Sequence, residues 1–547
     1  MLTAHPPLPA APFVRLTTRL YDRLAVAVLL VVGVCAALTF RDYGLGWDDY
    51  THSEYGDLLL AYYSSGFTDK RALSFVNLYM YGGGFDLLSA LAGKVLPFGV
   101  FETRRLMGAV VGIIGLAAAW RLARRLGGPL AGLLALVLLA TTPMFYGHMF
   151  MNAKDGPFAV AMCVLLLAIL RAIEAYPSPS RGTVVFLGLA LGLVLGTRIL
   201  GGIAVLFVIL PLALLVGQNI AEHGARTALR RFGGFVLVVA AGLPLGYLAM
   251  GLLWPWSVIE PLNPVRAIAY FSHFFEKPWR ELYEGIPVLV PDMPASYVPR
   301  LLALKLPETV GVFALAGCVG IVYAAAQKSI DVRKRAGLLL IFSAAVVPVV
   351  YAMISRPALY NGLRHFVFIV PPIAIIAGLA CAWAIEWLRE RGHVALVAGC
   401  AMLTLGLATT VRDMVLLHPY QYAFFNTLAG GVRGADRGYM LDYWGLAFKQ
   451  ATAQLRTTLE NSGETPPAGR TYWTVAVCGP QRVAQVEFGP KFRTTSDPKG
   501  ADFALVLREF YCREVNAPVI TDVVRDGVPF ATVYDIRGRT VRPLAAQ

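Results

Sequence analysis

The chain has 547 residues, of which 57% are hydrophobic and 15% charged, and its formal net charge is +14. Soluble proteins carry about a quarter of their residues as charged side chains, so this composition excludes an ordinary soluble enzyme. A helix needs about 20 consecutive apolar residues to cross the hydrocarbon core of a bilayer. We therefore predict an all-α polytopic membrane protein.

Apolar runs along the chain predict about eleven membrane-spanning helices. The longer runs cover residues 130–147, 199–221, 232–256, 309–327, 336–355, 366–385 and 394–411. Shorter runs reach spanning length if their ends snorkel or the helices tilt, and they cover residues 24–40, 106–120, 157–170 and 183–197. No small-residue cleavage site precedes Arg41, so we expect a retained first helix rather than a cleaved signal peptide.

Lysine and arginine gather in alternate loops between these runs. By the positive-inside rule these loops are cytoplasmic, as is the N-terminus, and an eleventh span then places the C-terminus outside. The charge thus indicates topology rather than nucleic-acid binding. The basic loops hold Arg121, Arg124, Arg125; Arg171, Arg181; Arg226, Arg230, Arg231; Lys328, Arg333, Lys334, Arg335; and Arg389, Arg391.

Two domains are predicted. Residues 1–411 form the transmembrane domain, with long outer loops at 41–104 and 257–308. Residues 412–547 form an outer linker and a small soluble α/β domain, because a helical pattern at 441–463 is followed by strand-like segments bounded by Gly and Pro. These segments are 471–479, 501–512 and 529–538. Cys478 and Cys512 lie in this outer tail, where a disulfide can persist, and their pairing is left open.

An acidic pair opens the first outer loop, in "GLGWDDYTHSEYG" (44–56). Asp48 and Asp49 could simply begin a helix. Alternatively, a partly desolvated carboxylate beside the membrane can act as a general base, because burial raises its pKa toward working pH. The second acid would orient the first or bind a metal.

The second outer loop, "YGHMFMNAKDGP" (146–157), crowds His148, Asn152, Lys154 and Asp155 between two spans. Ionisable residues at membrane depth are costly and tend to mark function. Asp and His can ligate a divalent cation, and Lys can neutralise a phosphate. Asp155 would equally cap a helix beginning at Gly156 and Pro157, and both interpretations can hold together.

Further polar residues occupy the remaining outer segments. Arg198 is the sole charge in residues 183–221 and could hold a phosphate or merely lie among lipid headgroups. The aromatic, Gly-rich stretch 418–445 could line a sugar site or serve as a linker. Before a late span, residues suited to a lipid-linked phosphate or to an interfacial anchor belt are Arg356, Tyr360, Asn361, Arg364 and His365.

Together these motifs resemble the polytopic glycosyltransferases of the GT-C fold, in the branch of the protein O-mannosyltransferases and aminoarabinose transferases (glycosyltransferase families 39 and 83). The resemblance rests on "WDDY", "HMFMNAKDGP", "YNGLRHFVFIVPP" and "HPYQYAFFNTLAGG…DYWG", and it covers most of residues 20–445. Many members have Asp-Glu where this chain has Asp48-Asp49. Residues 412–547 have no firm counterpart in the best-known members.

The resemblance implies a polyprenyl-phosphate-linked sugar donor and a single displacement with inversion. It implies a multi-pass protein of a bacterial inner membrane, with the C-terminal domain in the periplasm. The acceptor could be lipid A, another glycan, a lipid or a protein, and a divalent metal cation is possible. The implied roles are catalysis by Asp48 and Asp49, donor-phosphate binding by Lys154, Arg198, Arg364 and His365, metal or acceptor binding by Asp155 and His148, and substrate binding by Tyr360 and Asn361.

Other classes of protein remain as alternatives. A transporter or flippase of a lipid-linked or anionic substrate would place its charges near the bilayer midplane, whereas here they gather on one face. A non-catalytic scaffold would leave the acidic pair and the Lys-Asp loop unexplained. A ligase with a diphosphate-linked donor is the alternative among enzymes.

Overall fold

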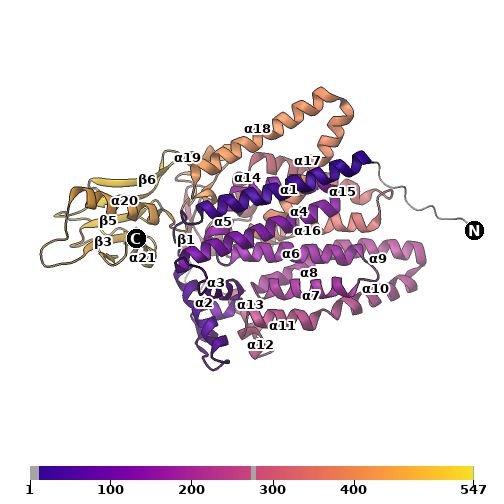
Figure 1. The fold of residues 1–547 in the computed structure, drawn as a ribbon, viewed down its shortest axis with the longest axis horizontal. Coiled ribbons are helices and arrows are strands. Elements are labelled where there is room, and N and C mark those ends of the chain that lie inside the picture. The colour runs from indigo at the N-terminus through magenta and orange to yellow at the C-terminus, as the bar shows by residue number, and fades with distance from the viewer. Residues whose placement is uncertain (1–11, 273–278, 546–547) are drawn as a thin grey trace, which may run out of the picture.

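The computed structural model describes residues 12–272 and 279–545. A bundle of long helices forms one part of the molecule, and a small domain with a β-sheet projects from one end of it (Figure 1). The predicted cytoplasmic N-terminus includes residues 1–11, which lie outside the described residues. The described part of the N-terminal helix begins at the end of the bundle opposite the small domain (Figure 1).

The bundle is built from long apolar helices joined by short turns. α17 (Val370–Arg391) lies at its centre, because 94% of its apolar window is buried, whereas only 6% of the window of α18 (His393–Leu417) is. The other long helices are α1 (Pro12–Thr39), α4 (Val100–Ala140), α6 (Asp155–Glu174), α7 (Arg181–Leu195), α9 (Ile209–His223), α10 (Ala225–Ala240), α11 (Leu243–Leu253), α15 (Glu308–Ala326) and α16 (Val332–Ser355).

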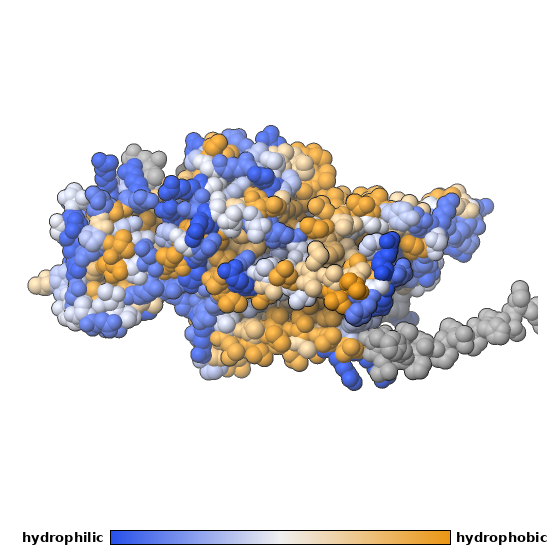
Figure 2. All heavy atoms as spheres, turned by 90° about the horizontal axis from the view of Figure 1, so that it is seen from above, coloured by the Kyte–Doolittle hydropathy of each residue, from blue (hydrophilic) through white to orange (hydrophobic). Residues whose placement is uncertain are grey.

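The outer surface of the bundle is apolar. Large side chains that a soluble protein would bury are exposed on peripheral helices, among them Leu38, Leu315 and Met402. Figure 2 shows this apolar surface as a broad area between polar ends of the molecule. Exposing so much apolar surface to water would be unfavourable, so the bundle is suited to contact lipid. The chain is a multi-pass membrane protein.

α4 is a hairpin rather than one straight helix. Gly128 adopts φ 85°, which reverses the chain before Pro129. Gly132 consequently packs back against Trp120 and Arg124 on the first arm of the hairpin. Only a residue without Cβ adopts this backbone region without strain, so the glycine permits the reversal. α4 therefore supplies two passes through the bundle.

This reversal accounts for part of a difference from the eleven predicted spans. Within residues 12–272 and 279–545, nine helices are long and apolar enough to cross a membrane. One of them is the α4 hairpin, which the sequence divided into two runs. α7, with 15 residues, is apolar but shorter than the other candidates. If the two arms of α4 are counted separately and α7 is counted as a short span, the described residues contain eleven passes in the predicted order.

Short elements cover the end of the bundle that faces the C-terminal domain. The first outer loop folds into α2 (Asp49–Ser64) and α3 (Gly84–Ala92). The remaining pieces are α5 (Pro143–Met151), α12 (Trp256–Ile259), α13 (Asn263–Ser272), α14 (Tyr297–Lys305), α19 (Gly431–Ala435), the hairpin of β1 (Arg280–Tyr283) and β2 (Ile286–Leu289), and the 3-10 turns Arg71–Ser74, Leu78–Met80, Ile199–Ile203, Val290–Asp292, Arg364–Ile369, Gln421–Ala423 and Thr427–Ala429. The short helix α8 (Ala204–Phe207) instead lies within the bundle, in the same candidate span as α9.

The C-terminal domain has a five-stranded sheet in the order β4-β3-β5-β7-β6. β3 pairs in parallel with β4 and β5, whereas β7 pairs antiparallel with β5 and β6. The three predicted strand segments correspond to β3, β5 and β7, and α18 continues beyond the predicted boundary at 411. The elements are α20 (Ala447–Ser462), β3 (Trp473–Cys478), α21 (Gln481–Phe488), β4 (Phe492–Thr495), β5 (Phe503–Leu507), β6 (Val519–Arg525) and β7 (Val528–Asp535).

Candidate active site

A cavity of about 2280 Å³ lies where the bundle meets the outer loops and the C-terminal domain. It is lined by segments that are far apart in the sequence, from the first outer loop to the turn after β5. Among its described lining residues, two side chains are acidic, Asp48 and Asp155. Five are basic, so the cavity has a positive balance suited to an anionic ligand: Lys154, Arg198, Arg280, Arg356 and Arg364.

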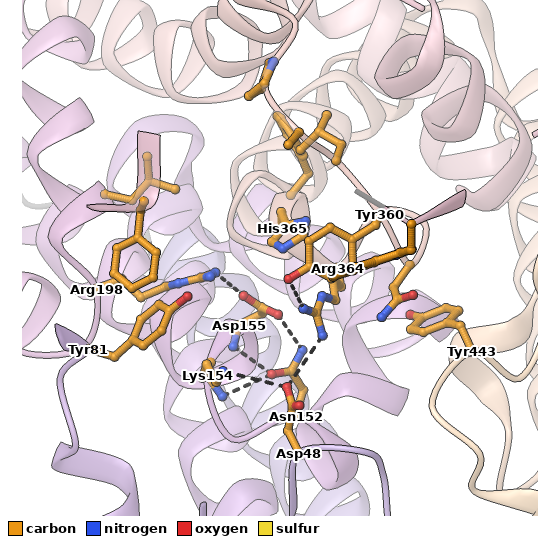
Figure 3. A pocket seen from close by; sticks show the side chains of 18 of the residues that line it. Asp48, Tyr81, Asn152, Lys154, Asp155, Arg198, Tyr360, Arg364, His365 and Tyr443 are labelled. Carbon is orange, nitrogen blue, oxygen red and sulfur yellow. Dashed lines mark hydrogen bonds and ion pairs between the residues drawn. The ribbon is translucent and has the colours of Figure 1, made fainter. Parts of the chain in front are cut away.

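Asp48 directly precedes α2 and faces two cations across the cavity. Its Oδ2 lies 3.7 Å from Lys154 Nζ and 3.7 Å from Arg364 Nη1 (Figure 3). Its side chain is 40% exposed, whereas those of Lys154 and Arg364 are 19% and 9% exposed. Asp48 is thus the more open member of a group of three charges, and a ligand in the cavity can reach its carboxylate.

The electrostatic balance at Asp48 differs from the sequence expectation. Burial is the largest single effect and raises its pKa, as predicted, but Lys154, Arg364 and His52 together lower the pKa further than burial raises it. The net pKa lies below the ordinary value of 3.8, because two nearby cations stabilise the carboxylate. Asp48 is therefore ionised at neutral pH and can accept a proton.

Asp49 has a different environment from its neighbour. It is 3% exposed and is not among the described residues that line the cavity. Its Oδ1 and Oδ2 accept hydrogen bonds from Arg105 at 3.1 and 2.5 Å, and Oδ2 also accepts from the Gly46 backbone at 2.7 Å. This geometry makes Asp49 a positioning residue that anchors the start of α2 beneath Asp48.

A second charged group surrounds Asp155 at the start of α6. Arg198 forms an ion pair with Asp155 Oδ1, and Asn152 Nδ2 donates to Oδ2 at 2.9 Å. Asn152 Oδ1 in turn accepts the backbone N–H groups of Lys154 and Asp155, which holds the turn at the head of the helix. The predicted cap by Asp155 is therefore wrong: Asp155 is the first residue of α6, its carboxylate faces Arg198 and Asn152, and the Asn152 side chain holds the turn instead (Figure 3).

Arg364 connects the two charged groups with an aromatic wall. Its Nη2 donates to Tyr360 Oη at 2.8 Å, and its guanidinium lies 4.5 and 4.6 Å from the ring centroids of Tyr360 and Trp444. Stacking of this kind fixes the guanidinium plane while leaving donors for an anion. His365 also lines the cavity, and its Nδ1 has no hydrogen-bond partner in the described chain.

Asn361 lies on the rim, where the backbone is tightly held. Glu281 of β1 accepts from the backbone N–H groups of Asn361 and Gly362 at 3.0 and 3.1 Å. Burial raises the pKa of Glu281, and these hydrogen bonds partly offset the increase. His148 lies behind the cavity wall, with Nδ1 3.1 Å from Asn152 Nδ2 and Nε2 3.3 Å from Tyr443 Oη.

The structure thus gathers most of the predicted site residues at one cavity. Its lining includes Asp48, Lys154, Asp155, Arg198, Tyr360, Asn361, Arg364 and His365, whereas Asp49 and His148 support it from behind. The sequence did not single out Tyr81, whose ring lies 4.7 Å from Lys154 Nζ. Nor did it single out Phe510 and Tyr511, which line the cavity. The sequence around the end of a strand does not show which distant part of the molecule the following turn contacts.

The predicted metal ligands are engaged by other side chains in this structure. Asp155 is neutralised by Arg198, and His148 is engaged by Asn152. In the described parts of the chain, no group of three His, Cys, Asp or Glu side chains is placed to hold a metal ion. A divalent cation in this part of the cavity would also be repelled by the positive charges of Lys154 and Arg364.

Part of the chain resembles a known family. Residues 87–245 match its model. The family is described as dolichyl-phosphate-mannose-protein mannosyltransferase, and the match confirms the resemblance noted from the motifs. It includes the Lys154–Asp155 loop and Arg198 but ends before Arg364. No curated protein matches the chain.

The solved structures to which this chain is similar include an oligosaccharyltransferase and a protein bound to undecaprenyl phosphate. The oligosaccharyltransferase AglB from Archaeoglobus fulgidus, in complex with an inhibitory peptide and a dolichol-phosphate, is 11% identical, with 88% of this chain and 69% of that chain covered and a TM-score of 0.49. ArnT from Cupriavidus metallidurans, bound to undecaprenyl phosphate, is 17% identical, with 94% and 97% covered and a TM-score of 0.47. Sequence identities and TM-scores this low do not show that this chain shares the function of either protein.

Proposed function

We propose that this protein is a membrane glycosyltransferase that transfers a sugar from a polyprenyl-phosphate-linked donor to an acceptor outside the membrane. The observation that carries the proposal is the Asp48 carboxylate, which lies in a positively charged cavity at the edge of the bundle, 3.7 Å from both Lys154 and Arg364. The family model matched by residues 87–245 describes transferases that use dolichyl-phosphate-mannose. The active site would face the periplasm of a bacterial inner membrane.

The cationic residues are placed to hold the donor phosphate. Lys154, Arg198 and Arg364 converge on one part of the cavity, with His365 beside them (Figure 3). Guanidinium and ammonium groups form charge-assisted hydrogen bonds with phosphate oxygens. Apolar residues on the membrane side of the cavity would accept the first isoprenoid units, among them Ile199, Leu200, Ile203 and Tyr351.

Asp48 would act as the general base in a single displacement. It takes the proton of an acceptor hydroxyl or amine while the oxygen or nitrogen of that group forms a bond to the anomeric carbon of the donor. The bond from this carbon to the phosphate oxygen breaks, and polyprenyl phosphate leaves with the electron pair. Arg364, Arg198 and Lys154 stabilise the charge that grows on the leaving oxygen. Attack from the face opposite the phosphate inverts the anomeric configuration.

Donor binding would also tune the base. Lys154 and Arg364 lower the pKa of Asp48 in the free enzyme. A bound phosphate would compete for the same two cations and add negative charge nearby, and both effects raise the pKa of a carboxylate. Asp48 would therefore become a stronger base when the donor is bound, so it would accept the acceptor proton most readily when transfer can follow.

The test is release of polyprenyl phosphate by purified protein from a panel of polyprenyl-phosphate sugars, with a membrane extract as acceptor source. We expect Asp48→Asn to lower release by about 10²–10⁴-fold, the usual contribution of a general base. Asp57→Asn is the matched control, since Asp57 is an exposed acid on the same helix outside the cavity lining. Equal turnover by wild type and Asp48→Asn would refute the mechanism, and no release from any donor would favour a transporter.

A further inference from the structure

The outer end of the cavity is walled by aromatic residues of the C-terminal domain and the linker before it. Tyr443 and Trp444 reach the cavity from the linker, and Phe510 and Tyr511 reach it from the turn after β5. These residues lie outside the candidate membrane spans. The charged residues around Asp48 therefore share the cavity with residues of the membrane helices and with these aromatic residues from outside the spans.

The position of Phe510 and Tyr511 follows from the sheet. β3 and β5 are parallel neighbours, with Cys478 opposite Val506, so both strands end at the same edge. In parallel sheets ligands commonly bind beyond the carboxyl ends of the strands. Here the chain leaving β5 turns at this edge and presents the two aromatic residues to the cavity.

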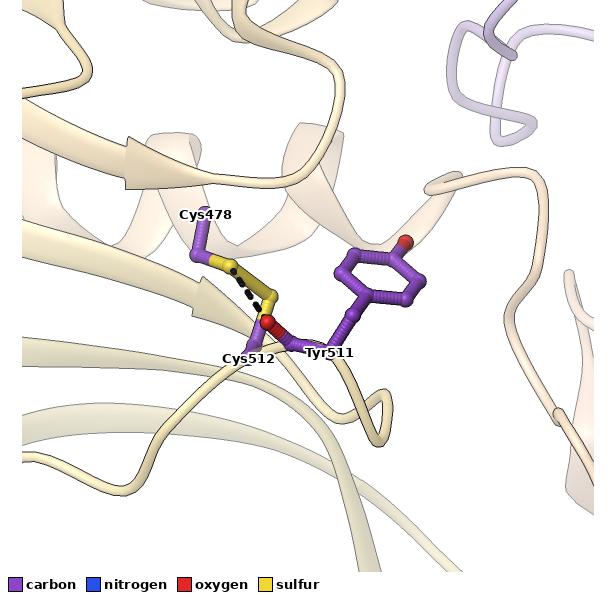
Figure 4. The surroundings of a disulfide bond; sticks show 3 residues. All are labelled: Cys478, Tyr511 and Cys512. Carbon is purple, nitrogen blue, oxygen red and sulfur yellow. Dashed lines mark hydrogen bonds between the residues drawn. A yellow bond between two sulfur atoms is a disulfide. The ribbon is translucent and has the colours of Figure 1, made fainter. Parts of the chain in front are cut away.

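A disulfide and an ion pair fix this turn. Cys478, the last residue of β3, is bonded to Cys512, directly after Tyr511, and the Tyr511 ring extends away from the bond (Figure 4). On the other side of the turn, Arg508 Nη2 lies 3.2 Å from Asp436 Oδ2 in the linker. The turn is therefore held at both ends, and its aromatic residues keep their place without a ligand.

We propose that Phe510 and Tyr511, held by the Cys478–Cys512 disulfide, form an acceptor subsite for a carbohydrate. This inference rests on the proposed function, which requires an acceptor to approach Asp48 from outside the membrane. Aromatic rings offer flat apolar faces that complement the C–H face of a sugar ring, and Tyr adds a polar group at its edge. A peptide acceptor would instead use backbone donors and acceptors, and a lipid acceptor would use the membrane-side end.

The first test measures binding without turnover. Saturation-transfer NMR is recorded with the full-length protein and methyl α-mannoside, methyl α-glucoside or methyl β-galactoside as the probe. We expect at least one glycoside to bind to the wild type, and its dissociation constant to rise about 10-fold in Phe510→Ala and Tyr511→Ala. Tyr511→Phe should retain binding because it keeps the ring. Tyr472→Ala, an aromatic change in the same domain outside the cavity lining, is the matched control.

The second test separates the acceptor subsite from the donor site. Release of polyprenyl phosphate is measured with a polyprenyl-phosphate sugar as donor and the glycoside as acceptor. The glycoside concentration that gives half-maximal release should rise about 10-fold in Phe510→Ala, with the donor KM unchanged. The double variant Cys478→Ser/Cys512→Ser should show the same pattern. An unchanged acceptor dependence in these variants, or acceptance of a Ser/Thr peptide or diacylglycerol but no glycoside, would overturn the subsite. Failure of the wild type with every donor would instead overturn the proposed function, and glycoside binding by NMR would still report on the subsite.

Discussion

Asp49 and Arg105 form a buried bidentate ion pair between the first outer loop and α4, with Nη–Oδ distances of 3.1 and 2.5 Å. Arg105 also donates to the Gly44 carbonyl at 2.6 Å, so one guanidinium fixes both the loop and the start of α2. Asp48 is adjacent in sequence but faces the cavity and its cations. Two neighbouring carboxylates thus have separate tasks, one structural and one in the proposed chemistry.

This separation predicts that substitutions of the two neighbouring residues affect stability to different extents. Asp49→Asn leaves the Arg105 charge buried without its partner, so we expect the free energy of unfolding to fall by about 3 kcal/mol. Asp48→Asn should cost much less, because the Asp48 side chain is 40% exposed and its two cations lie 3.7 Å away. Thermal unfolding of both variants in the same detergent measures the difference. Equal stability of the two variants would contradict the structural role of Asp49.

The pH dependence of the reaction should report the charge around Asp48. The carboxylate is active when ionised, and its pKa is lowered in the free protein, so the acid limb of kcat/KM should have its midpoint below the ordinary carboxyl pKa of 3.8. Donor phosphate raises the pKa, so the acid limb of kcat should lie at a higher pH. Initial rates across acid and neutral pH at low and saturating donor test both limbs. If the acid limbs of kcat and kcat/KM fall at the same pH, the donor phosphate does not share Lys154 and Arg364 with Asp48.

Arg364→Gln should affect both rate and proton affinity. Loss of one charge that stabilises the leaving phosphate should lower kcat by about 10²–10³-fold. Loss of one of the cations beside Asp48 should also move the acid limb of kcat/KM to higher pH. Arg71→Gln, which removes an exposed outer-loop arginine, is the control. A lower rate with an unmoved acid limb would show that Arg364 does not act on Asp48.

Chelation should leave the reaction unchanged. Asp155 forms an ion pair with Arg198, and a divalent ion at Asp48 would meet the charges of Lys154 and Arg364, each 3.7 Å from that carboxylate. Polyprenyl phosphate release is measured before and after treatment with EDTA and dialysis. Loss of release that Mg²⁺ or Mn²⁺ restores would contradict this expectation and would require a ligand set different from the one described.

The amino-acid sequence determined the features that depend on local composition. Apolar run length predicted the helices of the bundle, because a bilayer requires about 20 apolar residues in succession. The strands of the C-terminal domain followed from segments bounded by Gly and Pro. Clustering of polar residues in alternate loops was also sufficient to bring Asp48, Lys154, Asp155 and Arg364 to one side of the molecule.

Tertiary structure decided what depends on contacts between distant segments. The sequence alone could not distinguish the roles of Asp48 and Asp49. Arg105, which binds only Asp49, lies 56 residues away from it on another helix. The sequence predicted a raised pKa for Asp48 from burial, whereas Lys154 and Arg364, brought close by folding, lower it. Phe510 and Tyr511 reach the cavity only because the sheet docks its strand ends there. Local patterns encode elements, but charge balance and shared cavities arise from packing.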